Sequence, residues 1–233
     1  FDCRVVNQRN EEIISGDAVV KAPTKKPTAD ADLLDELRYH PRRAFQLLIE
    51  KVREYEPIRM AVCHPCSRTA LEGALDAAEA NLTIPILVGP DDRIRKVAEE
   101  NGFDITPYEI INALHIHHSA AKAVELCRSG AAEVLMKGSL HSDEIMSAVV
   151  KRDTGLRTAV RLSHVFIIDV PTYPKPLFVT DAAINIYAQL EEKLDIVRNA
   201  IERAHSLEIK MPKVAILSAV ETINPKIPST LEA

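Results

Sequence analysis

The sequence predicts an α/β protein with two domains, in which mostly parallel sheets are covered by helices. From residue 30 onward, short apolar runs alternate with segments of helical periodicity, the order that parallel strands and their connecting helices produce. The chain has 233 residues, enough for one large domain or two smaller ones. Hydrophobic residues make up 46% and charged residues 27%, the balance of a globular protein with a substantial core.

The first 22 residues differ from the rest of the chain. The polar stretch 7–10 divides two short runs that are rich in β-branched residues. These runs include Val5 and Val6, Ile13 and Ile14, and then Val19 and Val20. This pattern predicts a short β-hairpin, which would need further strands to bury its apolar face. The segment 22–28 has two prolines and two lysines, a linker composition that marks a domain boundary.

The middle of the chain predicts strands and helices in alternation. We expect strands at 59–63, 84–88 and 132–136. Two helices should cover 69–80 and 91–101. A third helix should bury the face formed by Ile116, Ala120, Ala123 and Cys127. A fourth helix should bury the face formed by Ile145, Met146, Val149 and Val150. In parallel sheets, ligands bind beyond the carboxyl ends of the strands, where loops lead into helices.

Local signals mark where these helices begin and end. Thr69 and Glu72 have the spacing of a capping box at the start of the first helix. Gly102 should end the second helix, because glycine readily adopts the left-handed conformation found after helix ends. Ser142 is the expected cap of the fourth helix.

The C-terminal part predicts strands at 165–170, 177–180 and, as a buried strand, 214–217. Its clearest amphipathic stripe is formed by Leu190, Leu194, Val197, Ile201 and Ala204. Residues 228–230 have the composition of a helix start, and the chain stops just beyond them. We therefore expect a second domain that is truncated.

Composition excludes several classes of function. The net charge of −5 argues against nonspecific nucleic-acid binding, which needs clustered lysine and arginine. There is no apolar run near the roughly 20 residues that span a bilayer, so no membrane partner is expected. Four cysteines without a regular pattern are typical of a reducing compartment. These features predict a cytoplasmic globular protein.

Two clusters of metal-binding residue types have ordinary explanations. Cys63 and Cys66 form a CxxC motif, but Cys3 and Cys127 are isolated and do not complete a zinc site. The motif is interpreted as the end of a strand followed by a turn. The histidines at 115, 117 and 118 lack the i, i+4 spacing of a helical metal site, and they are interpreted as solvated side chains.

Three segments carry groups that suit an anion. The segment 137–142 combines a glycine, hydroxyl groups and an expected helix start, whose free amides attract anions; the alternative is a plain capped turn. Arg152, Arg157 and Arg161 follow within ten residues, and a guanidinium matches the geometry of phosphate oxygens; the alternative is a solvated basic stretch. Asp181 and Asn185 follow a strand and are separated by small residues, although Asp181 can equally cap a helix.

Seven segments, taken together, resemble the phosphate acetyl/butyryltransferase family. They are 61–66, 85–90, 136–144, 155–158, 162–166, 178–185 and 215–221. The leading strands, with 6–8 and 16–20, resemble the end of a MaoC-type enoyl-CoA hydratase domain. That order implies an internal piece of a bacterial bifunctional enoyl-CoA hydratase/phosphate acetyltransferase.

The resemblance implies a domain division and a reaction. Residues 1–27 would be the tail of the hydratase domain plus a linker, 28–165 the first acyltransferase domain and 166–233 part of the second. The architecture would be that of isocitrate/isopropylmalate dehydrogenases, with the active site between the domains. The reaction would be acyl-CoA + phosphate ⇌ acyl phosphate + CoA, with acetyl as the acyl group, no metal, no covalently bound cofactor and no covalent enzyme intermediate. CoA, acyl phosphate and inorganic phosphate would be the partners of a homodimer.

The resemblance also assigns roles to residues. Arg157 corresponds to the family position that binds phosphate. Asp181 and Asn185 would orient the substrate from the facing domain. The amides and hydroxyls of the binding loop would come from Gly138, Ser139, His141 and Ser142.

One departure and two alternatives accompany this resemblance. Family members carry a later segment with a Ser-Arg pair and an Asp that assists the thiol, and this chain ends before it; we therefore expect the fragment to be impaired or inactive. An NAD(P)-dependent oxidoreductase of similar architecture is one alternative, although the chain lacks G-x-G-x-x-G and clustered metal-binding Asp residues. A non-catalytic remnant or assembly module is the other.

Overall fold

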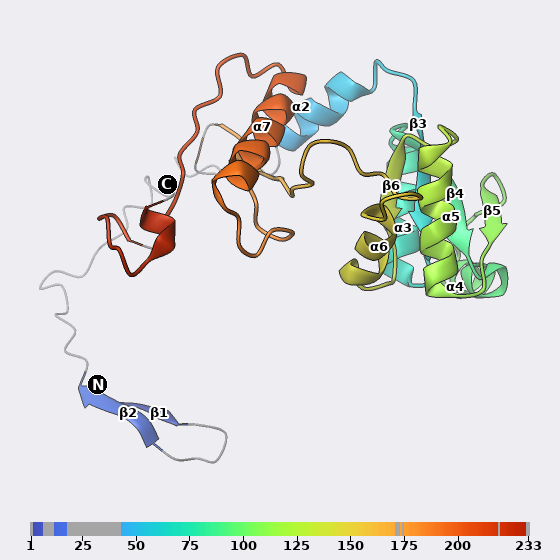
Figure 1. The fold of residues 1–233 in the computed structure, drawn as a ribbon. Helices are drawn as coiled ribbons and strands as arrows, with labels where there is room; N and C mark the ends of the chain where they lie inside the picture. Colours follow the sequence, from blue (N-terminus) through green and yellow to red (C-terminus); the bar gives the residue numbers. More distant parts are fainter. Residues whose placement is uncertain are drawn as a thin grey trace, which may run out of the picture. The chain divides into compact units, whose positions relative to one another are not determined.

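The computed structural model describes residues 2–6, 12–17, 43–170, 173, 175–218 and 220–231. The chain divides into two units, 1–40 and 41–233. In the first unit, β1 (Asp2–Val6) pairs in antiparallel fashion with β2 (Glu12–Asp17) (Figure 1). The predicted hairpin is thereby confirmed. Three segments lie outside the described residues: the connection at 7–11 between the two strands, the run with Val19 and Val20, and the expected linker at 22–28.

The second unit contains a parallel four-stranded sheet. Its strands are β3 (Ile58–Cys63), β4 (Thr83–Gly89), β5 (Glu109–Asn112) and β6 (Val134–Lys137). Their order is β5-β4-β3-β6, and all three pairings are parallel. The three predicted strands of this region are therefore confirmed as central or edge strands of one sheet, which places their carboxyl ends on the same edge.

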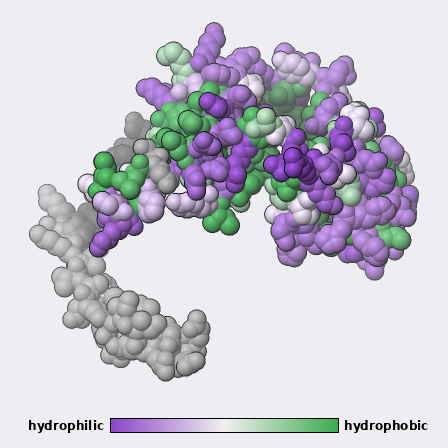
Figure 2. Space-filling model, viewed as in Figure 1, coloured by the Kyte–Doolittle hydropathy of each residue, from purple (hydrophilic) through white to green (hydrophobic). Residues whose placement is uncertain are grey.

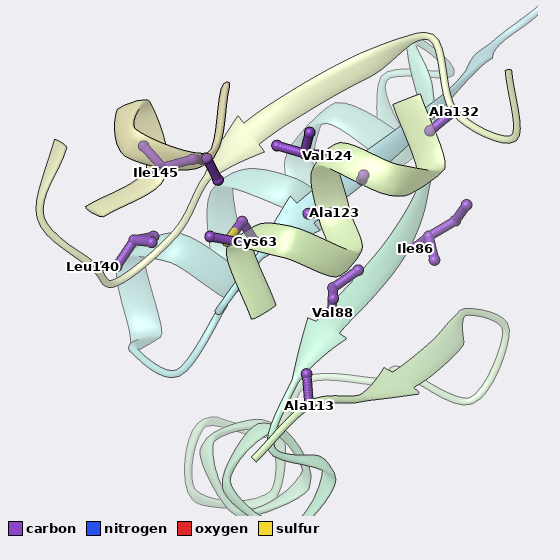
Figure 3. Close-up of a cluster of buried hydrophobic side chains, with 12 residues drawn as sticks. Cys63, Ile86, Val88, Ala113, Ala123, Val124, Ala132, Leu140 and Ile145 are labelled. Carbon is purple, nitrogen blue, oxygen red and sulfur yellow. The ribbon is translucent and has the colours of Figure 1, made fainter. Parts of the chain in front are cut away.

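Helices cover both faces of the sheet. They are α3 (Arg68–Glu79), α4 (Asp91–Asn101), α5 (Ile116–Arg128) and α6 (Ser142–Val149). Ala61 and Cys63 point toward the face covered by α5 and α6, in a cluster that Figure 3 shows. Met60 and Val62 point the opposite way, toward α3 and α4. Because side chains alternate along a strand, the apolar run Met60–Cys63 of β3 is buried on both faces of the sheet.

Two of the predicted helix caps are wrong by one or two residues. The cap of α3 is Ser67, whose hydroxyl accepts a hydrogen bond from the N–H of Ala70 at 3.4 Å, and not a box formed by Thr69 and Glu72. The cap position of α6 is His141, so Ser142 is already the first helical residue. Gly102 ends α4 in the left-handed conformation, φ 69°, as predicted.

The C-terminal part of the second unit has less regular structure. It contains β7 (Phe166–Ile168), β8 (Leu177–Val179), the predicted amphipathic helix as α7 (Leu190–Ser206) and a 3-10 turn at Pro228–Thr230. The unit also includes α2 (Arg43–Val52), whose Lys51 pairs with Glu208 just after α7. Figure 2 shows more hydrophobic side chains at the surface around α7 and the C-terminal segment than over the four-stranded sheet.

Two expectations for this part are wrong. The strands β7 and β8 pair in antiparallel fashion with each other, so they do not belong to a second parallel sheet. The run 214–217 forms no strand, and Leu217 is 87% exposed. An apolar run becomes a strand only where a neighbour offers backbone hydrogen bonds, and in the described ranges of the chain no strand pairs with 214–217.

No helix in the described part of the chain is both long and apolar enough to cross a lipid bilayer.

Candidate functional site

The ends of β3 and β6 are joined by hydrogen bonds between the two loops that follow them. The N–H of Gly138 donates to the carbonyl of Cys63 at 2.9 Å, and the N–H of Ser139 donates to the carbonyl of His64 at 2.9 Å. The hydroxyl of Ser139 donates to the same His64 carbonyl at 2.8 Å and accepts from the N–H of Cys66 at 3.0 Å. We call this set of bonds the loop clasp. It fixes the segment 137–141 against the CxxC turn.

The clasp explains the glycine at 138. A Cβ at this position would lie 2.7 Å from the His64 carbonyl oxygen and 2.8 Å from its carbon, and closer still to the carbonyl oxygen of Cys63. Backbone atoms cannot yield as a flexible side chain can. The sequence indicated a close approach of backbone to an anion here, whereas the close approach in the structure is between two loops of the chain itself.

A hollow of about 560 Å³ lies at this edge of the sheet. Its walls come from the first turn of α3, the start of α5 at Ile116, and the clasped loop with Gly138, Ser139 and His141. Lys137 also lines the hollow, and its ammonium group donates to the carbonyl of Leu140 at 2.7 Å. Three helices thus begin around one concave region, and free amides at helix starts suit a negatively charged group.

The CxxC motif is confirmed as a strand end and turn. Cys63 is the last residue of β3 and is fully buried. Burial, together with the neighbouring Cys66 thiol and the Glu144 carboxylate, raises the pKa of Cys63 to about 12. Burial also raises the pKa of Cys66. Because the thiolate is the reactive form, neither thiol is set up as a nucleophile.

The three histidines near the start of α5 are solvated side chains, as interpreted from the sequence. His115, His117 and His118 are exposed at the start of α5. Among the residues that the structure describes, no three histidine, cysteine or acidic side chains gather in a way that could hold a metal ion.

Arg157 lies in a second, larger hollow of about 1020 Å³. One wall comes from Met146 and Val149 of α6, and another from α7. Arg157 is exposed, and it makes no hydrogen bond or ion pair with any residue in the described ranges. Its guanidinium fork is therefore available to an anion.

Arg161, unlike Arg157, is held in a network of hydrogen bonds. Its Nε donates to the side-chain oxygen of Asn185 at 2.6 Å, and its guanidinium lies 3.6 Å from the Glu192 carboxylate. The amide nitrogen of Asn185 donates in turn to the carbonyl of Leu162 at 3.0 Å. Both polar atoms of the Asn185 side chain are thus engaged within the protein.

Asp181 organises the turn that carries Asn185. Its Oδ1 accepts from the N–H groups of His164, Ala183 and Ile184. Its Oδ2 accepts from the backbone and the side chain of Asn185. Burial alone would raise the pKa of Asp181, but the hydrogen bonds from Asn185, Ile184 and Ala183 outweigh it and lower the pKa below the usual value. The carboxylate is thus ionised and fully used in holding the turn.

The structure brings the predicted site residues together in two groups. Arg157 and Asn185 line the larger hollow, beside the turn held by Asp181. The loop residues line the smaller hollow, with Ser142 at the adjoining first turn of α6. Helix α6 contributes to both hollows, through Glu144 to the smaller and through Met146 to the larger. Arg157 and the loop line different hollows, and the common cleft implied by the resemblance stays a prediction.

Sequence reasoning missed His64 and Ser119. His64 is 2% exposed and Ser119 is fully buried, and Nδ1 of His64 lies 3.2 Å from Oγ of Ser119. One signal was present: Ser119 is a polar residue next to Ala120, on the apolar face of its helix. Such a residue needs a hydrogen-bond partner from another element.

Comparison with known proteins supplies the family. The family model described as phosphate acetyl/butaryl transferase matches residues 113–233. The chain belongs to this family. Its members include a phosphate acetyltransferase from Rhizobium meliloti that is 52% identical over 189 residues, covering 81% of this chain and 60% of the relative. A phosphate butyryltransferase from Clostridium acetobutylicum is 39% identical, covering 82% of this chain and 64% of the relative.

Two solved structures show the same fold. A branched-chain phosphotransacylase from Enterococcus faecalis V583 superposes with a TM-score of 0.62 at 27% identity, covering 76% of this chain and 61% of that one. A phosphotransacetylase from Streptococcus pyogenes gives a TM-score of 0.63 at 18% identity, covering 79% and 66%, a likeness of fold alone. The chain spans 60% of the length of the Rhizobium relative and 54% of a Rickettsia felis phosphate acetyltransferase.

The clasp predicts that Gly138→Ala is destabilising. The new methyl group would force apart the two loops, and overpacking of this kind costs about 1–3 kcal/mol. Gly73→Ala is the matched control, because its Cβ would meet only the end of Met136 at an ordinary 3.6 Å, and alanine favours a helix by about 0.5–1 kcal/mol over glycine. Urea unfolding should therefore show opposite signs for the two variants. Equal free energies of unfolding would contradict the close approach.

His64 predicts a pH dependence of stability. Burial lowers its pKa, the positive charge of Arg93 on α4 lowers it further, and Glu144 on α6 opposes them. The unfolded chain then binds a proton that the folded chain does not, so stability present above about pH 6.5 is lost as the pH falls toward the depressed pKa. The loss amounts to about 1.4 kcal/mol for each unit of pKa depression.

The test compares the chain with His64→Asn, which does not titrate, keeps a hydrogen-bonding group and tolerates the left-handed conformation of this residue, φ 56°. Urea unfolding between pH 7.5 and pH 5 should show a steeper loss of stability for the unmodified chain, with both pH limits set around the ordinary histidine value of about 6.5. Parallel curves would show that His64 does not contribute.

Proposed function

We propose that the protein represented by this chain transfers acyl groups between CoA and phosphate: acyl-CoA + phosphate ⇌ acyl phosphate + CoA. The observation that carries the proposal is the family match, together with 52% and 48% identity to two proteins named phosphate acetyltransferase. Relatives named as phosphate butyryltransferases are 39% and 33% identical. Acetyl is therefore the acyl group that we propose.

The reaction makes two physical demands. In the direction of acyl-CoA formation, the CoA thiolate forms a bond to the acyl carbonyl carbon, the bond from that carbon to the phosphate oxygen breaks, and its electron pair leaves with inorganic phosphate. The protein must stabilise the departing phosphate charge and hold both reactants in line. A cationic fork in a concave surface meets the first demand.

Arg157 is the residue that we propose for phosphate. Its guanidinium lines the larger hollow and has no partner in the described part of the chain, whereas Arg161 beside it is bound to Asn185 and Glu192. Asn185 and Asp181 then act indirectly. Asp181 holds the turn and Asn185 holds Arg161, so together they shape the wall of the hollow next to Arg157.

For CoA we propose the smaller hollow and the clasped loop. The N–H groups of Gly138 and Ser139 are occupied in the clasp, so their contribution is the shape of the loop. Ser142 has a hydroxyl that forms no hydrogen bond with the described residues, and it stands in the first turn of α6, where free amides favour a phosphate group. His141 lines the hollow beside it.

Further proposals concern the organisation of the protein. We propose the division into 1–27, 28–165 and 166–233, with a MaoC-type hydratase domain preceding the acyltransferase. The separation of unit 1–40 from the rest supports a boundary in this region, and the resemblance of the leading strands supports the hydratase. We also propose a homodimer in the cytoplasm with no metal requirement, on the basis of the family resemblance and the cysteine pattern.

Ligand binding tests the proposed function. Separate additions of CoA and acetyl phosphate should raise the temperature of thermal unfolding, because a ligand that binds only the folded state stabilises it by about 2.7 kcal/mol at one hundred times its Kd. NAD(P) with Mg²⁺ should have no effect. A shift with NAD(P) and none with CoA would favour the oxidoreductase. The absence of a shift with every ligand would favour the non-catalytic module.

The role of Arg157 is tested by Arg157→Gln. Losing a charge-assisted hydrogen bond to phosphate, worth about 1.5–3 kcal/mol, should weaken acetyl phosphate binding by about tenfold to a hundredfold while CoA binding changes little. Arg152→Gln is the matched control, since Arg152 is an exposed arginine that does not line the hollow. Calorimetric titration measures both affinities. Equal affinities for acetyl phosphate in the two variants would remove Arg157 from the site.

A further inference from the structure

We propose that His64 and Ser119 are positioning residues, which hold the clasped loop in the geometry that ligand binding requires. Neither residue lines one of the two hollows, although the backbone carbonyl of His64 is part of the loop clasp. The inference rests on the proposed function for the identity of the ligand, CoA. The arrangement of the pair itself follows from its contacts.

The contacts assign the hydrogen atoms of the pair. The hydroxyl of Ser119 faces the backbone carbonyls of His115 at 3.1 Å and Ala113 at 3.4 Å. A hydroxyl has one hydrogen to donate, and a carbonyl can only accept. Because the hydroxyl already faces two acceptors, we assign its hydrogen to a carbonyl and the Nδ1–H tautomer to His64, which then donates to Ser119 Oγ at 3.2 Å.

The imidazole and the backbone of His64 serve two different elements. The imidazole is bound to Ser119 in the first turn of α5. The carbonyl of the same residue accepts the N–H and the hydroxyl of Ser139 and the N–H of Cys66. The backbone N–H of His64 donates to Val88 at the end of β4 at 2.7 Å. A single residue thus links α5, β4 and the clasped loop.

The pair connects two walls of the smaller hollow. Ile116, three residues before Ser119, lines the hollow from α5, and the loop at 138–141 lines it from the carboxyl end of β6. The His64–Ser119 hydrogen bond fixes the orientation of the ring, and with it the direction of the His64 carbonyl that holds the loop. Loss of the bond should therefore loosen the loop before it loosens the sheet.

Simple packing would not select these two residues. His64 has the left-handed conformation, φ 56°, which costs free energy for a residue other than glycine. A buried polar pair also loses hydration that an apolar pair of similar volume would not lose. A directional hydrogen bond instead specifies one arrangement of the loop, which is what a preorganised binding surface needs.

The test compares Ser119→Ala with Ser129→Ala, the same substitution at the exposed, opposite end of α5. Hydrogen exchange of the ligand-free chain reports on the loop directly. In Ser119→Ala, the amides of Gly138 and Ser139 should exchange about tenfold faster than in the unmodified chain, the effect of a lost buried hydrogen bond, while amides of β3 and β4 change less. Ser129→Ala should show no such local change.

The second measurement is the Kd for CoA, which should rise about tenfold in Ser119→Ala and stay unchanged in Ser129→Ala. His64→Asn keeps a hydrogen-bonding group near the position of Nδ1, so its loop protection and CoA affinity should match those of the unmodified chain. His64→Ala has no such group and should lose both. If His64→Ala does not fold, Ser119→Ala and His64→Asn still decide the matter.

Each result has a definite meaning. Unchanged exchange at Gly138 and Ser139, uniform acceleration across β3 and β4, or loosened amides with unchanged CoA affinity would each overturn the positioning role. If the unmodified chain does not bind CoA, the proposed function fails, and the exchange measurement then shows independently whether the pair holds the loop.

Discussion

The loop clasp between the backbone of Cys63 and His64 and the backbone of Gly138 and Ser139 is the constraint on which the candidate sites depend. It joins two loops that are 75 residues apart in the sequence, and it does so at the carboxyl edge of the parallel sheet. The segment that it fixes leads directly into α6, and α6 forms part of both hollows. The clasp thus sets the start of the helix that separates the proposed CoA surface from the proposed phosphate surface. The clasp requires glycine at position 138, because a Cβ there would overlap the backbone of Cys63 and His64.

The sequence predicted the sheet and its helices well where burial alone determines structure. The apolar runs 60–63 in β3 and 85–89 in β4 are buried on both faces of the sheet, and the face of α5 with Ala120 and Ala123 is buried as its periodicity indicated. The run 214–217 has the same apolar character but remains exposed. The composition of a segment indicates that it favours burial, but it does not identify the strand that would pair with the segment and bury it. For the same reason the antiparallel pairing of β7 and β8 could not be predicted from either strand.

Prediction of the sites was limited by the direction of hydrogen bonds. The sequence singled out the segment 137–142, and the structure does place it at a strand end beside a hollow. It could not show that the N–H groups of Gly138 and Ser139 point at the chain's own carbonyls, since these carbonyls belong to Cys63 and His64, 75 residues away in the sequence. Likewise, the small residues between Asp181 and Asn185 suggested substrate contact, whereas the two side chains bind the turn and Arg161. The long-range partner of a polar side chain is a property of the fold.

Scalar couplings across hydrogen bonds, measured by NMR on the ligand-free chain labelled with ¹⁵N and ¹³C, test the clasp most directly. The account predicts one coupling from the amide nitrogen of Gly138 to the carbonyl carbon of Cys63 and another from Ser139 to His64, together with slow exchange of both amides. Rapid exchange of these amides without either coupling would contradict it, because the loop would then have no fixed geometry to offer a ligand.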